Sequence, residues 1–311
     1  MDVDALVAGV LAGEARAVAR AISLVEDGGP ELQLLSARIF ERTGRAATVG
    51  LTGAPGVGKS TLAAGLVAAA RRQGKRIAVL AVDPTSPFTG GALLGDRVRM
   101  QEHATDPDVF IRSMATRGHL GGMALAAPEA VRILDAAGYD VVVVETVGVG
   151  QAEVDVAAAT DTVVVTLAPG LGDAVQIAKA GILEIADIFV VNKGDRDGSS
   201  QVVRDLRQML HLGEARDREP PVLTTIAGTG EGVPELWRAI EDHRGWAEGS
   251  GALAAKRRAR LVREVQTLAA ARFAASAAVR LADDGTLVER LADRRLDPYA
   301  AAEALLRGAS E

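Results

Sequence analysis

The residues with the clearest chemical meaning form a glycine-rich run that reads Gly-Ala-Pro-Gly-Val-Gly-Lys-Ser and is followed by threonine. It matches the pattern G-x-x-x-x-G-K-[ST], in which glycines let successive backbone N–H groups curl around a polyphosphate. The lysine of this pattern bridges the β- and γ-phosphates, and the serine hydroxyl ligates Mg²⁺. We therefore predict a nucleotide site made of Gly53, Ala54, Pro55, Gly56, Val57, Gly58, Lys59, Ser60 and Thr61.

A second motif, Asn192-Lys193-Gly194-Asp195, matches N-K-x-D and indicates guanine. Guanine presents two donors, N1–H and the 2-amino group, that one carboxylate accepts together, whereas adenine has an acceptor at N1 and no 2-amino group. We assign this task to Asp195, and we expect the stem of Lys193 over the purine ring and Asn192 holding the loop. Ile226 and Ala227 complete the predicted base site, with Ile226 standing where motifs of the S-A type carry serine.

Three acidic residues, Asp83, Asp96 and Glu145, are candidates for the catalytic site. Asp83 and Glu145 each end a short apolar run, and parallel sheets place their ligands beyond the carboxyl ends of strands. Glu145 opens E-T-V-G, where a carboxylate reaches Mg²⁺ through water and Gly148 gives its N–H to the γ-phosphate. The predicted catalytic residues are Lys59, Asp83, Glu145 and Gly148. The sequence does not select an arginine finger among the candidates Arg97, Arg99, Arg112 and Arg117.

The elements that must position these residues alternate between short β-branched runs and longer helical stretches. Several runs are almost continuously apolar, as in parallel strands covered on both faces. The alternation predicts βαβ units and an α/β fold: a mostly parallel P-loop NTPase sheet flanked by helices, over residues 46–248. The expected strands are Ala47–Leu51, Arg76–Val82, Val109–Ser113, Asp140–Glu145, Thr162–Leu167, Ile188–Asn192 and Pro221–Thr225.

Helical segments are expected on both sides of this domain. Residues 1–45 form an N-terminal helical extension that breaks at residues 27–30, and residues 249–311 form a C-terminal helical arm after a Gly-Ser-Gly hinge. The basic run Lys256–Arg263 is interpreted as a solvated helix face rather than an anion site or partner site. Short helices need packing to be stable, so we expect the arm to pack against a second subunit.

Composition limits the classes of partner and compartment. The chain has 311 residues, a formal net charge of −6 without a basic half, and no cysteine. These features disfavour a nucleic-acid partner and exclude disulfides, cysteine-ligated zinc and thiol catalysis. The first residues lack the basic start and apolar run of a signal peptide, and the apolar runs are too short to cross a bilayer. We expect a cytoplasmic protein without a membrane partner.

Together these motifs resemble the MeaB/ArgK-like GTPases, a family of the SIMIBI class of P-loop NTPases that includes the methylmalonic aciduria type A protein. The resemblance spans about residues 1–310 and rests on the P-loop, the base motif and five further runs: V-D-P-T-S-P, L-G-D-x-x-R-M, G-H-L-G-G, E-T-V-G-V-G-Q and P-G-x-G-D. The run Ser113–Arg117 differs from the proline-containing run common in the family.

The resemblance implies a homodimer, formed through the C-terminal arm, that hydrolyses GTP slowly alone and faster with an adenosylcobalamin-dependent acyl-CoA mutase. The mutase, chiefly methylmalonyl-CoA mutase in this family, carries the cobalamin; the GTPase gates cofactor loading and protects its partner. The resemblance also implies that Ser60, Asp83, Asp96 and Glu145 hold Mg²⁺ and that Lys179 lies in a loop communicating with the mutase.

Three other functions stay open at this point. An ATP-dependent kinase linked to arginine or ornithine transport predicts adenine preference, against which Asp195 argues. A nickel-insertion GTPase typically carries Cys and His ligands, but this sequence has no cysteine and four scattered histidines. The third is a nucleotide-controlled scaffold with negligible turnover. Measuring the rate of GTP hydrolysis with and without a mutase separates it from a GTPase that serves the mutase.

Overall fold

The computed structural model describes residues 2–83, 105–115, 123–146, 156, 158–170, 182–213 and 216–307. The chain divides into two compact units, Met1–Arg260 and Leu261–Glu311. The first unit contains a sheet with the helices that cover it. The second contains most of one long helix, α12 (Ala252–Asp283), and the helices that follow it.

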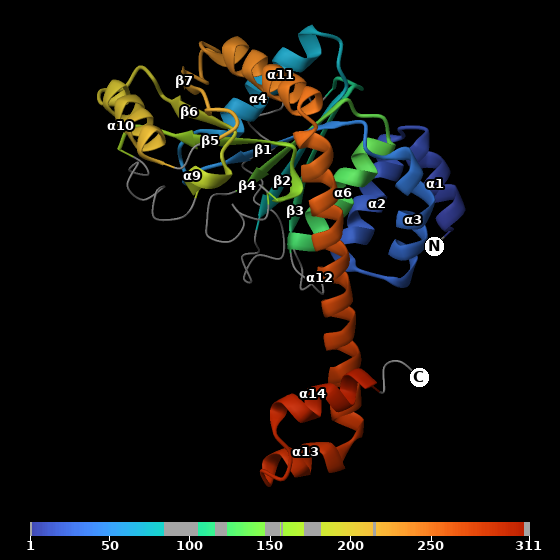
Figure 1. Ribbon diagram of the computed structural model, residues 1–311. Coiled ribbons are helices and arrows are strands. Elements are labelled where there is room, and N and C mark those ends of the chain that lie inside the picture. The colour runs from blue at the N-terminus through green and yellow to red at the C-terminus, as the bar shows by residue number, and fades with distance from the viewer. Residues whose placement is uncertain are drawn as a thin grey trace. The chain divides into compact units, whose positions relative to one another are not determined.

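The seven described strands form one parallel sheet in the order β3-β2-β4-β1-β5-β6-β7 (Figure 1). This confirms the predicted α/β class and its parallel sheet. Each expected run overlaps one strand, and the observed ends differ from the expected ones by at most two residues. The strands are β1 (Ala47–Thr52), β2 (Ile77–Asp83), β3 (Val109–Ala115), β4 (Val141–Thr146), β5 (Thr162–Leu167), β6 (Ile188–Asn192) and β7 (Val222–Thr225).

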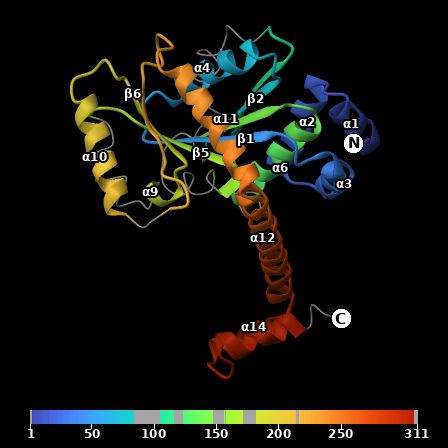
Figure 2. The same ribbon diagram turned by 45° about the horizontal axis from the view of Figure 1, so that its top comes forward.

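Both faces of the sheet are covered, which explains why its strands are apolar almost without interruption. In β2, Ile77 and Val79 enter one core with α4 (Lys59–Arg72) and α11 (Val233–Gly249), whereas Leu80 and Val82 enter the other. The second core lies under α6 (Met123–Ala136) and the N-terminal helices, and Figures 1 and 2 show the two sets of helices on opposite faces. A third cluster joins β5 and β6 to α9 (Ile182–Ile185) and α10 (Ser199–Leu212).

The N-terminal helices are part of the same compact unit as the sheet. They are α1 (Val3–Leu11), α2 (Ala15–Asp27), α3 (Pro30–Ile39) and the 3-10 turn η1 (Phe40–Arg42). The break at residues 27–30 is confirmed, but a further break separates α1 from α2. Gly13 lies there with φ 73°, a conformation that glycine adopts without steric cost and that ends α1.

The first turns of α12 are tied to the amino-terminal edge of the sheet, so the expectation of a solvated basic face is wrong for three of its residues. Arg257 and Arg260 donate to the carboxylate of Asp161 at 2.6 and 3.0 Å, and Lys256 Nζ lies 3.2 Å from Asp187 Oδ2. The two aspartates precede β5 and β6 and are mostly buried. Burial raises the pKa of Asp161, but the bond from Arg257 and the charges of both arginines outweigh burial and lower that pKa.

The second unit contains α13 (Gly285–Ala292) and α14 (Pro298–Arg307) besides the rest of α12. Asp284 caps α13 by accepting from the Leu287 N–H at 3.0 Å, and Arg280 of α12 donates to the Leu305 carbonyl at 3.2 Å. Several apolar side chains of α12 are more than half exposed, namely Val262, Val265 and Val279. In the described part of the chain, no helix combines the length and apolar character needed to cross a lipid bilayer.

Candidate nucleotide site

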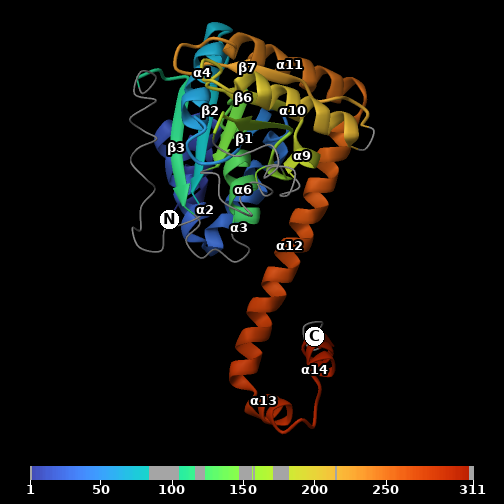
Figure 3. The ribbon, with the colours of Figure 1, turned by 90° about the vertical axis from the view of Figure 1, so that its left-hand side faces the viewer.

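The carboxyl ends of the strands meet at one edge of the sheet, which is where parallel α/β sheets bind ligands. The central strand β1 ends at Thr52, and its neighbour β4 ends at Thr146, with 3.3 Å between the two hydroxyl oxygens. Glu145 stands opposite Leu51 in the register of these strands. The parallel order therefore brings Glu145 beside the loop that follows β1. Figure 3 shows the sheet from the side of β3 and β2.

The glycine-rich loop between β1 and α4 requires glycine for two different reasons. Gly53, Gly56 and Gly58 have φ values of 139°, 80° and 98°, which residues with a side chain rarely adopt. A Cβ at Gly53 would overlap the carbonyl oxygen of Thr166, and one at Gly58 would overlap the side-chain amide of Asn192. The loop thus curls in close contact with the ends of β5 and β6, where a side chain would not fit.

Lys59 opens α4 and folds back into this loop. Its ammonium donates to the carbonyl oxygens of Gly53 and Ala54 at 2.6 and 3.1 Å, and the residue is 5% exposed. A positive charge inside a curl of backbone, at the amino-terminal end of a 14-residue helix, forms an environment that favours phosphate. Phosphate oxygens can replace the two carbonyls as acceptors for the ammonium.

Ser60 and Glu145 lie in contact. The Ser60 hydroxyl donates to Glu145 Oε1 at 2.6 Å, and Glu145 is 5% exposed. One oxygen comes from the first turn of α4 and the other from the end of β4. An all-oxygen pair of this kind fits Mg²⁺, which prefers carboxylate, hydroxyl and water ligands.

The remaining acidic candidates are only partly located. β2 ends at Asp83, and because Ala81 pairs with Glu145, the backbone of Asp83 lies at the same edge of the sheet. The side chain of Asp83, together with Asp96 and Gly148, lies outside the described residues, as does Lys179.

Asn192 connects the phosphate loop to the loop after β7. Its side-chain amide donates to the Val57 carbonyl at 2.8 Å, while its Oδ1 accepts from the Ala227 N–H and the Thr225 hydroxyl at 3.0 Å each. Asn192 is 2% exposed. Ile226, which stands where S-A motifs carry serine, has no side-chain part in these bonds; the contacts to Asn192 come from Thr225 and the backbone of Ala227.

Of the other two functional residues of the base motif, Lys193 reaches the phosphate loop and Asp195 is exposed to solvent. Lys193 has φ 59° and its ammonium donates to the Gly56 carbonyl at 2.7 Å. Asp195 is exposed and makes no ion pair with another described residue. Its carboxylate is therefore available to a ligand that lies beside Lys193.

The structure adds one residue to the site and removes one candidate. Thr225, the last residue of β7, supports Asn192, and its position at the end of the neighbouring strand is the signal that could have identified it. Arg112 donates to the Ala19 carbonyl, Ser23 and Glu26, so it joins β3 to α2 and is not placed as an arginine finger.

Comparison with known proteins decides the family. The family model described as methylmalonyl Co-A mutase-associated GTPase MeaB matches residues 18–280. The chain belongs to the MeaB family.

Relatives of this MeaB-family chain include proteins that are named as GTPases. A Pyrococcus horikoshii protein named as a GTPase is 50% identical over 308 residues, covering 98% of this chain and 97% of that protein. The Escherichia coli GTPase ArgK is 40% identical over 250 residues, 78% of this chain and 76% of ArgK. The mouse mitochondrial methylmalonic aciduria type A homolog is 37% identical over 274 residues, 82% of this chain and 66% of the homolog.

A solved structure extends the agreement to the fold. The crystal structure of the LAO/AO transport system kinase superposes with a TM-score of 0.73 at 28% identity, covering 99% of this chain and 98% of that one. The MeaB-family chain is thus a P-loop GTPase, a hydrolase that acts on GTP, as the sequence predicts.

Proposed function

We propose that this MeaB-family GTPase hydrolyses Mg²⁺·GTP at the described edge of the sheet and uses the reaction to serve an adenosylcobalamin-dependent acyl-CoA mutase. The observation that supports the site most strongly is the double contact of Asn192. One side chain holds the phosphate loop through Val57 and the base loop through Ala227, so both ends of one nucleotide are aligned by the same residue.

The phosphate end is assigned to the loop 53–61. Its backbone N–H groups and the ammonium of Lys59 bind the triphosphate, and Ser60 and Glu145, with Asp83 and Asp96, hold Mg²⁺. Bound Mg²⁺ neutralises charge that develops on the phosphate oxygens during hydrolysis. Gly148 contributes its N–H to the γ-phosphate.

The base end is assigned to Asp195. Its carboxylate accepts from guanine N1–H and the 2-amino group, and the stem of Lys193 covers the ring. Adenine would leave this carboxylate without a donor, a penalty that discriminates strongly between bases. The same argument disfavours an ATP-dependent kinase, although the similar crystal structure is that of a protein named as a transport system kinase.

Nucleotide titrations of the parent protein and Asp195→Asn test the base assignment. Xanthine has a carbonyl where guanine has the 2-amino group, so an asparagine amide can donate to that carbonyl while its oxygen accepts from N1–H. We expect Asp195→Asn to lose at least about tenfold in affinity for GTP and to gain in affinity for XTP. Asp197→Asn, an exposed neighbour, is the matched control. Unchanged GTP affinity in Asp195→Asn, or equal ATP and GTP affinity in the parent, would overturn the assignment.

The mutase partner is proposed from the family description and from the mouse relative's name. We expect the mutase to carry the cobalamin and this chain to carry the nucleotide. Titrating purified methylmalonyl-CoA mutase into the GTPase should raise the rate of GTP turnover. Unaltered turnover with that enzyme and with related acyl-CoA mutases would contradict the partner assignment, and negligible turnover in all conditions would favour the scaffold hypothesis.

We propose a homodimer formed through the second unit. Val262, Val265 and Val279 are 53, 65 and 61% exposed, and a helix with so much apolar surface is stabilised by packing against another chain. Light scattering of the full chain should give twice the mass of the monomer. Val262→Asp combined with Val265→Asp should give monomers that still bind GTP, and a persisting dimer would place the interface elsewhere.

A further inference from the structure

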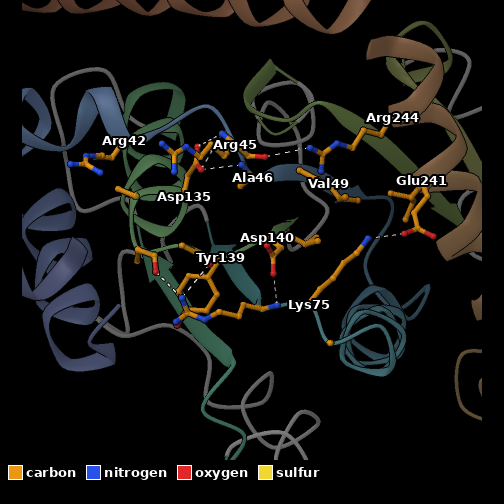
Figure 4. A pocket seen from close by; sticks show the side chains of 18 of the residues that line it. Arg42, Arg45, Ala46, Val49, Lys75, Asp135, Tyr139, Asp140, Glu241 and Arg244 are labelled. Carbon is orange, nitrogen blue, oxygen red and sulfur yellow. Dashed lines mark hydrogen bonds and ion pairs between the residues drawn. The ribbon is translucent and has the colours of Figure 1, made fainter. Parts of the chain in front are cut away.

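A cavity of about 740 Å³ lies at the edge of the sheet opposite to the nucleotide site. Its wall includes the starts of β1 and β4, Ala47 and Val141, and the residue before β2, Arg76. Figure 4 shows Arg42 and Arg45 on one side of it and Lys75 with Glu241 on the other. The volume is typical of sites for small organic molecules, which commonly occupy 300–1,000 Å³.

Five cations line the cavity, and three of them have partners within the chain. Lys75 pairs with Glu241 at 2.7 Å. The guanidinium of Arg76 donates to the carbonyls of Ala137 and Gly138 and lies over the Tyr139 ring, with 4.7 Å to the centroid. Arg244 pairs with Glu248 at 2.8 Å. These three cations neutralise carboxylates and helix-end carbonyls of the fold itself.

The other two cations, Arg42 and Arg45, differ from these three. Both side chains are exposed, and neither guanidinium has a hydrogen-bond or ion-pair partner among the described residues. They are three residues apart, at the end of η1 and just before β1. Both guanidinium groups border the same cavity, and each carries several directed N–H donors of the kind that suit a phosphate or carboxylate group.

The three acidic residues that line the cavity make their hydrogen bonds and ion pairs with groups other than the Arg42 and Arg45 side chains. Asp135 accepts from the backbone N–H groups of Gly44, Arg45 and Ala46, and Asp140 accepts from the Arg76 N–H at 2.8 Å. Glu241 is the partner of Lys75. The carboxylates that line the cavity therefore accept from backbone N–H groups or from Lys75, and the donors of Arg42 and Arg45 stay available to a ligand.

Apolar and aromatic groups form much of the remaining wall, namely Leu11, Val49, Tyr139, Trp237 and Ile240. We propose that this cavity binds a small organic phosphate monoester, with its phosphate on Arg42 and Arg45 and its apolar part against these side chains. The site is separate from the nucleotide site, because the cavity lies at the start of the six-residue strand β1 and the phosphate loop follows its end.

Calorimetric titration of phenyl phosphate into the full chain loaded with Mg²⁺ and GDP tests the proposal, since the bound nucleotide occupies the phosphate loop. We expect saturable binding at least about tenfold tighter than that of inorganic phosphate, because the ring buries apolar surface. Benzyl alcohol, which has the ring without the charge, should bind more weakly than phenyl phosphate by a similar factor or more.

Two double variants separate this site from general charge attraction. Arg42→Ala with Arg45→Ala should weaken phenyl phosphate binding at least about tenfold and leave GDP affinity unchanged. Arg16→Ala with Arg20→Ala removes the same charge from exposed positions of α2 and should leave binding unchanged. The proposal would be overturned if both double variants lost the same affinity for phenyl phosphate, if binding were not saturable, or if added GDP displaced phenyl phosphate.

Discussion

The hydroxyl of Ser60 and the carboxylate of Glu145 are joined by a hydrogen bond of 2.6 Å between the first turn of α4 and the end of β4. Ser60 and Glu145 are 85 positions apart in the sequence, and they meet because β1 and β4 are neighbours in the sheet. Two oxygen atoms of the kinds that Mg²⁺ prefers therefore converge, and the proposed Mg²⁺ would take the place of the proton that joins them.

Removing the Ser60 hydroxyl should raise the Mg²⁺ concentration required for GTP hydrolysis. We expect Ser60→Ala to raise the half-maximal Mg²⁺ concentration about tenfold or more, because it deletes one ligand and the partner of Glu145. Ser60→Thr keeps a hydroxyl and should stay near the parent. Steady-state turnover against Mg²⁺ concentration measures the effect, and an unshifted curve for Ser60→Ala would remove Ser60 from the metal site.

Replacing Lys59 should abolish tight nucleotide binding while the fold persists. The ammonium donates to the carbonyl oxygens of Gly53 and Ala54 inside the phosphate loop, so Lys59→Ala removes the positive charge that the triphosphate is proposed to meet there. In the parent, GDP at about 100 times its dissociation constant should stabilise the fold by about 2.7 kcal/mol. Thermal unfolding should show this stabilisation in Lys75→Ala, at the opposite edge, and not in Lys59→Ala.

Truncating Asn192 should weaken binding of GTP and GDP together and also destabilise the protein without ligand. Asn192→Ala leaves the Val57 carbonyl and the Ala227 N–H without their side-chain partner inside the protein, at a cost of about 1–3 kcal/mol. Thr225→Val deletes one of the three bonds and should cost less. Denaturant unfolding and nucleotide titration measure the two effects. Reduced GTP affinity with unchanged GDP affinity would contradict a role in aligning the whole nucleotide.

The aspartate that anchors α12 should make stability depend on acid pH. The pKa of Asp161 is lowered in the fold, so its contribution is full above the unfolded value of about 3.9 and is lost as pH falls through the folded pKa. At pH 7, Asp161→Asn should destabilise the first unit by roughly 3 kcal/mol, because it leaves Arg257 and Arg260 without their carboxylate.

Denaturant unfolding from pH 7 down to about pH 3 measures this dependence. The difference between parent and Asp161→Asn should shrink as the pH falls. Asp27→Asn, at an exposed position, should change stability by less than about 0.5 kcal/mol at each pH. A constant difference across the range would mean that Asp161 acts through packing and not through its charge.

The strands were predictable because their residues alternate between two buried faces, so burial appears in the sequence as uninterrupted apolar runs such as Val141–Val144. The break at Gly13 was missed because its neighbours continue the helical pattern, and the left-handed φ of one glycine leaves no periodic signal. The contacts of Lys256, Arg257 and Arg260 with buried aspartates are not predictable from the sequence for another reason. Charges in a helix are usually solvated, and their acceptors lie about 70–100 positions away in the chain.

The sequence by itself determined the phosphate loop and the base motif, because each is a contiguous run whose glycines and side chains act through local backbone geometry. It also determined the parallel α/β class through hydrophobic patterning. Only the tertiary structure decided that Asn192 contacts Val57, which lies 135 positions away in the sequence. It also decided that Arg42 and Arg45 border a cavity and that their side chains have no partner among the described residues. Contacts between distant residues depend on strand order and register, which no local pattern encodes.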